Sequence, residues 1–118
     1  MNERILVVDD EMDILEFVEP FLSEEGYQVR TSPGGSIFQH IQRDLPDLIL
    51  LDIFLREKDG RVICRQLKAN ELTKQIPVIL FSAHASRENA LSQSDADDFI
   101  GKPFNLQNLL KLVRKHLP

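Results

Sequence analysis

Two short apolar runs in this chain end in aspartates, and this pattern constrains the fold more than any other feature. The first run, residues 5–8, is followed by Asp9 and Asp10, and the second, residues 48–51, is followed by Asp52. Continuous apolar runs of this length are typical of strands that are buried on both faces, as in parallel sheets. If the two strands are parallel neighbours, the three aspartates meet at the carboxyl edge of the sheet, where open α/β sheets bind their ligands.

Three neighbouring carboxylates repel one another. Two unit charges about 4 Å apart repel by about 1 kcal/mol in water and by about 4 kcal/mol at an effective dielectric constant of about 20. A protein tolerates such a cluster when a divalent cation neutralises it or when one acid stays protonated. The ligands are oxygens, with no His or Cys nearby in sequence, which favours Mg²⁺. The alternative interpretation is that solvated acids cap the strand ends and begin the next helix.

The rest of the chain alternates strand-like and helix-like segments, which is typical of a parallel sheet with crossover helices. Strands are expected over residues 4–9, 28–31, 47–51, 78–81 and 98–100. Helices are expected over residues 12–25, 36–43 and 61–70, within 84–98, and over 106–117 after an N-cap at Asn105. The sequence therefore predicts an α/β fold in which a doubly wound, five-stranded parallel sheet carries five helices.

Two of these helices need a separate remark. The segment 84–98 has only one large apolar side chain, Leu91, beside three alanines, so we expect a fourth helix that is short or poorly ordered. The last helix carries Lys111, Arg114 and Lys115 in its later turns, where cations suit the helix dipole. That explanation is sufficient for the basic cluster, and no further role is expected for His116.

Composition excludes several classes of protein. A chain of 118 residues, 42% hydrophobic and 28% charged, is expected to form one domain over residues 1–118. A net charge of -5, with 14 Lys and Arg spread along the chain, argues against a nucleic-acid-binding surface. No signal peptide or membrane span is predicted, and the single cysteine, Cys64, is expected to be a small core or half-buried residue in a helix. We therefore expect a cytoplasmic domain that binds neither membranes nor nucleic acid.

Polar residues also follow the last two strands, Ser82 after the fourth and Lys102 after the fifth. An aspartate nucleophile, a metal ion, a hydroxyl and an ammonium can together hold a phosphoryl group, because phosphoryl transfer requires mainly positioning and charge neutralisation. With these residues in order, the chain resembles the response-regulator receiver domains of two-component signalling. The resemblance covers the whole length and rests on the motifs VVDDE from residue 7, DLILLDI from 47, DG from 59 and DDFIGKPF from 97.

The resemblance implies a flavodoxin-like fold with strand order 2-1-3-4-5 and a set of site residues. Asp52 would be the phosphoacceptor, taking a phosphoryl group from a histidine kinase or a histidine phosphotransfer protein. Mg²⁺ would be the cofactor, bound by Asp10, Asp52 and the backbone carbonyl of Phe54, while Asp9 would assist through water. Such a domain is not a conventional enzyme, although it catalyses its own Mg²⁺-dependent phosphorylation and dephosphorylation.

The resemblance also implies a conformational switch. Phosphorylation adds about 1.5 to 2 negative charges, which would recruit Ser82 and Lys102. Phe99 would be the aromatic switch residue that turns inward when Ser82 shifts, and the peptide before Pro103 is expected to be cis. The change in conformation would alter the binding of a downstream protein that the sequence does not identify.

The chain departs from the family pattern at two places. Arg56-Glu57 occupies the position of the family's usual Pro-Gly pair, which adds charges near the site. The separation of Ser82 and Lys102 is shorter than usual, and the shortage falls in the weak fourth helix. Many family members bind targets through the fourth helix, fifth strand and fifth helix, so we expect this output face to differ.

Two other interpretations stay open. A pseudo-receiver would keep the fold as a protein-interaction module without being phosphorylated. A phosphatase of the haloacid-dehalogenase type also uses an aspartate nucleophile, Mg²⁺ and a lysine, but it requires a second acid at the position of Phe54.

Overall fold

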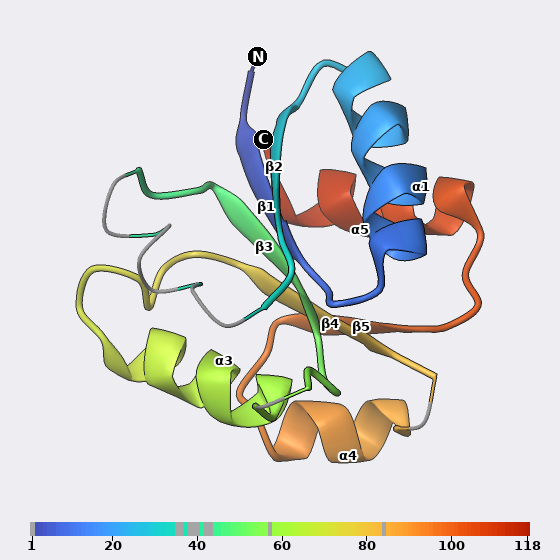
Figure 1. Ribbon diagram of the computed structural model, residues 1–118. Helices are drawn as coiled ribbons and strands as arrows, with labels where there is room; N and C mark the ends of the chain where they lie inside the picture. The colour runs from blue at the N-terminus through green and yellow to red at the C-terminus, as the bar shows by residue number, and fades with distance from the viewer. Residues whose placement is uncertain (1, 35–36, 38–40, 42–43, 57, 84) are drawn as a thin grey trace.

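The computed structural model of the chain contains the predicted parallel sheet (Figure 1). The structure describes residues 2–34, 37, 41, 44–56, 58–83 and 85–118. All neighbouring strands pair in parallel, in the order β2-β1-β3-β4-β5, which confirms the predicted topology. The strands are β1 (Arg4–Val8), β2 (Gln28–Ser32), β3 (Leu48–Asp52), β4 (Val78–Ser82) and β5 (Asp98–Gly101).

Helices cover both faces of the sheet, as a doubly wound fold requires (Figure 1). Those of the described residues are α1 (Met12–Glu24), α3 (Gly60–Ala69), α4 (Arg87–Ser92) and α5 (Leu106–His116). The further helix expected over 36–43 falls mostly outside the described residues, although its Ile37 and Ile41 are described and buried. The fourth helix is short, as predicted, with only six residues.

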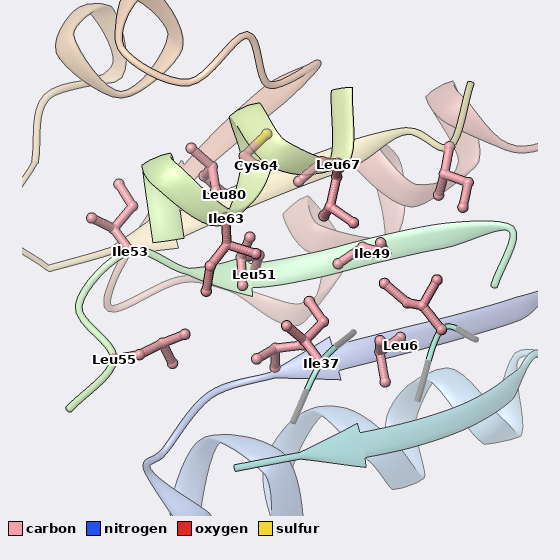
Figure 2. Close-up of a cluster of buried hydrophobic side chains, with 14 of the residues drawn as sticks. Leu6, Ile37, Ile49, Leu51, Ile53, Leu55, Ile63, Cys64, Leu67 and Leu80 are labelled. Carbon is pink, nitrogen blue, oxygen red and sulfur yellow. The ribbon is translucent and has the colours of Figure 1, made fainter. Parts of the chain in front are cut away.

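Alternate residues of each central strand point to opposite faces, so the sheet separates two hydrophobic cores. One core lies between the sheet and α1 and α5, with Val7, Leu50 and Phe81 among its strand residues. The other lies between the sheet and α3 and α4, where Leu51 packs near Ile63 (Figure 2). Because both faces are covered, β3 and β4 are buried along their whole length, which explains their continuous apolar sequences.

Cys64 lies in the second core, as predicted (Figure 2). Its side chain is fully buried, and burial raises the pKa of the thiol to about 12. A thiol with such a pKa stays protonated at neutral pH, so Cys64 is a packing residue and not a reactive one.

Local sequence signals define where three helices begin. Asp59, Ser86 and Asn105 each accept a hydrogen bond from a backbone N–H in the first turn of the helix that follows. The N-cap predicted at Asn105 is therefore confirmed. No helix in the described part of the chain is long and apolar enough to cross a membrane.

Candidate functional site

The register of the sheet brings the three aspartates together. Val8 pairs with Leu51, so Asp9 and Asp52, the next residues of the two chain segments, lie beside each other at the carboxyl edge. One carboxylate oxygen from each of Asp9, Asp10 and Asp52 lies within 4.8 Å of the others. Asp9 and Asp52 are buried, whereas Asp10 is partly exposed. The predicted acidic cluster is therefore present.

Lys102, which follows β5, reaches into this cluster. Its Nζ lies 2.8 Å from Oδ2 of Asp9, 3.1 Å from Oε1 of Glu11 and 3.6 Å from Oδ1 of Asp52. Nζ also lies 5.0 Å from the centre of the Phe81 ring. Burial by itself would lower the pKa of Lys102, but the hydrogen bonds to Asp9 and Glu11 outweigh it and raise the pKa, so the ammonium stays charged.

The pKa of Asp52 reflects its buried and acidic surroundings. Burial and the neighbouring Asp9 carboxylate raise the pKa of Asp52 to about 7, although Lys102 and the backbone N–H of Phe54 act in the opposite direction. Metal-free Asp52 is therefore partly protonated at neutral pH, mainly because it is removed from water. An additional cation at this edge would favour the ionised form of Asp52.

Ser82 lies at the same edge because it ends β4. It pairs with Gly101, its side chain is buried, and its carbonyl accepts a hydrogen bond of 2.9 Å from the backbone N–H of Lys102. The peptide between Lys102 and Pro103 is cis, as expected. Strand register thus places the serine and lysine beside the aspartates.

Phe99 of β5 points into the core. It pairs with Leu80, is only 8% exposed and belongs to the cluster that contains Ala90 of α4. The side chain of this predicted switch residue therefore points inward, on the face of the sheet that α4 covers. Whether the ring moves on phosphorylation stays a prediction.

The Asp59-Gly60 motif has a structural reason that the sequence did not reveal. The backbone N–H of Gly60 donates a hydrogen bond of 2.6 Å to the carbonyl of Ile53, so α3 begins directly against the end of β3. A Cβ atom on Gly60 would lie 2.2 Å from the carbonyl oxygen of Asp52. Only glycine allows the helix to begin this close to the aspartate.

Arg56 contacts the site. Its backbone N–H donates a hydrogen bond of 3.0 Å to Oδ2 of Asp10, and its Nε lies 3.8 Å from the same oxygen. The residue at the position of the family's usual proline therefore places a guanidinium beside a predicted metal ligand. Its neighbour Glu57 lies outside the described residues.

The basic residues at the end of α5 have a role that the sequence interpretation missed. Asp98, the first residue of β5, is fully buried, and its Oδ2 lies 3.2 Å from Nζ of Lys115 and 3.0 Å from Nε2 of His116. Arg87 of α4 contacts the other oxygen at 2.9 Å. The helix dipole is therefore not the whole explanation for Lys115, and the expectation that His116 has no further role was wrong. The sequence did not indicate that Asp98 is fully buried, and so it did not indicate that Asp98 needs cationic partners.

The donor set fits a divalent ion of the Mg²⁺ type. Three carboxylates lie close enough to share an ion, and burial keeps most bulk water from Asp9 and Asp52. All these ligand atoms are oxygens, which suit Mg²⁺. Burial is the main cause of the raised pKa of Asp52, the Asp9 carboxylate adds to it, and a bound cation would lower it.

Comparison with known proteins agrees with this geometry. The family model described as response regulator receiver domain matches residues 5–114. The response regulator PleD of Caulobacter vibrioides is 39% identical over 117 residues, which are 97% of this chain and 26% of PleD. The DNA-binding dual master transcriptional regulator RpaA of Synechocystis sp. is 36% identical over 114 residues, which are 94% of this chain and 47% of RpaA.

Solved structures give the same result. The crystal structure of a response regulator from Chloroflexus aurantiacus is similar with a TM-score of 0.90 at 30% identity, covering 98% of this chain and 97% of that one. The chain spans less than half the length of PleD and RpaA, so the similarity to those two proteins concerns only the part they share with it.

Proposed function

The chain belongs to the family of response regulator receiver domains, and from this premise we propose that it is a phosphoacceptor switch that carries its phosphoryl group on Asp52. One observation carries the proposal: the carboxylate of Asp52 is buried at the sheet edge, within reach of two further carboxylates and 3.6 Å from the ammonium of Lys102. A nucleophile, a candidate metal site and a fixed cation therefore converge at one point.

Asp52 would act as the nucleophile. A carboxylate oxygen of Asp52 would form a bond to the phosphorus of a phosphohistidine while the phosphorus–nitrogen bond of the donor breaks. The donor would be a cytoplasmic histidine kinase or a histidine phosphotransfer protein. Because the reaction needs the ionised acid, the raised pKa of Asp52 must fall when the site is loaded.

The acidic residues would hold the metal ion. Asp10, Asp52 and the carbonyl oxygen of Phe54 would bind it directly, with Asp9 acting through water. Mg²⁺, when bound, supplies positive charge that offsets the charge on the transferred oxygens. Asp9 would also keep Lys102 in place, since these two side chains already form a hydrogen bond of 2.8 Å.

Ser82 and Lys102 would bind the new phosphoryl group. Lys102 would exchange part of its interaction with Asp9 and Glu11 for the phosphoryl oxygens, and the Ser82 hydroxyl would donate to another of them. The accompanying shift at the end of β4 would change the position of the Phe99 ring, which lies beside β4 in the core under α4. A downstream protein would respond to that change.

The proposal is tested by incubating the protein with acetyl phosphate and Mg²⁺ and measuring its mass. We expect the parent protein to gain the mass of one phosphoryl group, and we expect no gain in Asp52→Asn or when EDTA is present. The pseudo-receiver interpretation predicts an unmodified parent, and the position of the Arg56 guanidinium beside Asp10 is the observation that favours it. An equal gain in the parent and in Asp52→Asn would exclude Asp52 as the acceptor.

A further inference from the structure

Arg61, in the first turn of α3, contacts three separate parts of the molecule. Its Nε and Nη2 donate hydrogen bonds of 3.0 and 2.7 Å to the two carboxylate oxygens of Asp59. Its guanidinium lies 5.7 Å from the centre of the Phe54 ring, and its Nη1 donates a hydrogen bond of 2.6 Å to Oε1 of Gln93. The planar guanidinium, with donors on several sides, can make these contacts at the same time.

The first two contacts fix the backbone at the phosphoacceptor. Phe54 and Asp59 form an isolated antiparallel bridge, so the loop between them is closed at its base. Within this loop Phe54 donates its backbone N–H to Asp52 and would supply a carbonyl oxygen to the metal ion. Arg61 holds both ends of the bridge, through the ring of Phe54 and through the carboxylate of Asp59.

The third contact reaches a different element. Gln93 is the C-terminal cap residue of α4, and α4 lies beside α3 on one face of the sheet (Figure 1). The helix has six residues, of which Ala90 is fully buried and Leu91 packs partly buried against the core, so its apolar anchoring is small. Arg87 fixes the start of the helix through its ion pair with Asp98, and the hydrogen bond from Arg61 to Gln93 fixes its end.

From this juxtaposition we infer that Arg61 is a positioning residue: it holds the backbone of Phe54 in place for the metal ion and connects the phosphoacceptor loop to the end of α4. The inference rests on the proposed function, since it assumes that the loop binds Mg²⁺. α4 is then connected to the phosphoacceptor loop through Arg61 of α3. This connection is additional to the route through β4 and Phe99.

The first test measures Mg²⁺ affinity by calorimetric titration of the folded protein. Arg61→Lys keeps the positive charge but loses the planar fork, and we expect its affinity to fall by about tenfold, as is typical when a partner outside the ligand shell is lost. The matched control is Arg65→Lys, one turn later on the exposed side of α3, which should bind Mg²⁺ within about twofold of the parent. Equal affinity in the parent and Arg61→Lys would overturn the inference.

The second test measures the response of α4. Beryllofluoride with Mg²⁺ serves as the phosphoryl mimic, and hydrogen exchange is followed over residues 87–93. We expect the mimic to change exchange there in the parent and in Arg65→Lys. Gln93→Ala should keep parental Mg²⁺ affinity and show a smaller response than the parent, because the connection through Arg61 is removed while the route through Phe99 remains.

The two tests separate this inference from the proposed function. A parent protein that binds no Mg²⁺ would contradict the proposed function itself. A parent that binds Mg²⁺, together with an undiminished α4 response in both Arg61→Lys and Gln93→Ala, would overturn the inference alone.

Discussion

At Gly60 the backbone leaves no room for a side chain. A Cβ atom there would lie 2.2 Å from the carbonyl oxygen of Asp52 and 2.9 Å from Cα of Ile53. Both neighbours are backbone atoms, which cannot move aside without displacing the end of β3. We therefore expect Gly60→Ala to lower the free energy of unfolding by about 3 kcal/mol, the upper end of the usual cost of overpacking.

Urea denaturation measures this effect, and Gly101→Ala is the matched control. A Cβ atom on Gly101 would meet its nearest neighbours at 3.9 Å, which is ordinary van der Waals contact. We expect this variant to stay within about 1 kcal/mol of the parent. Equal losses in the two variants would show that the close approach at Gly60 is not what matters.

Arg56 places a cation beside Asp10, a predicted metal ligand. Its Nε lies 3.8 Å from Oδ2 of Asp10, but the side chain is 86% exposed, so water screens most of the interaction. Removing the charge in Arg56→Gln should raise Mg²⁺ affinity by about two- to fivefold, corresponding to the roughly 0.5–1 kcal/mol of an exposed pair. The backbone hydrogen bond to Asp10 is kept in this variant. Titration calorimetry measures the change, and a weaker affinity than that of the parent would contradict the prediction.

Among the elements, α4, β5 and α5 are joined by one buried carboxylate. The carboxylate of Asp98 contacts Arg87 of α4 and both Lys115 and His116 of α5. It also accepts a hydrogen bond of 3.0 Å from the backbone N–H of Phe99. Burial alone would raise the pKa of Asp98, but these hydrogen bonds, with that of His116 foremost, hold it well below its usual range. The negative charge is therefore part of the structure at neutral pH.

Asp98→Asn should lower the free energy of unfolding by about 2 kcal/mol at pH 7, the typical loss for hydrogen bonds to a charged group. Because the pKa is lower in the folded state than in the unfolded state, this contribution is fully present above the unfolded pKa of about 3.9 and is lost as pH falls through the folded value. The difference between parent and variant should therefore shrink in acid. Urea denaturation at a series of pH values measures it.

Glu88→Gln provides the control for that series, because Glu88 is an exposed acid in the first turn of α4. We expect its difference from the parent to stay within about 0.5 kcal/mol at neutral pH. A constant difference between the parent and Asp98→Asn from neutral pH into acid would show that the charge of Asp98 does not stabilise the fold.

For the molecule as a whole, the acidic edge makes folding depend on both pH and metal. The pKa of Asp52 is about 7 in the folded protein and near 3.9 when unfolded, so the metal-free folded state binds more protons between these values. Its stability should therefore fall as pH rises through this window. Mg²⁺ competes with the proton, so the stabilisation by Mg²⁺ should increase over the same range.

Thermal unfolding at pH 5 and pH 8, with and without Mg²⁺, measures this linkage. At a Mg²⁺ concentration of 100 times Kd, binding should stabilise the folded protein by about 2.7 kcal/mol. In Asp52→Asn we expect a smaller effect of Mg²⁺ and a flatter dependence on pH, because the titrating ligand is gone. A stabilisation by Mg²⁺ that is larger at pH 5 than at pH 8 would contradict this account.

The sequence by itself determined the sheet, its covering helices and the polar residues at its edge. Continuous apolar runs identified β3 and β4, and Asn105 marked the start of α5. These signals are local, because an apolar run, a helix period and a capping residue each involve residues that are close together in the chain. The resemblance to a family added the cis peptide before Pro103.

Only the tertiary structure decided which distant side chains meet. The packing of different elements brings together Asp98 and His116, and likewise Arg61 and Gln93. The spacing of these residues in the sequence does not predict either contact. Burial changes the chemistry of such residues, because a carboxylate removed from water must either find cations or hold its proton. Asp98 is surrounded by cationic side chains and has a lowered pKa, whereas metal-free Asp52 has a raised pKa and tends to hold its proton. That difference comes from the fold.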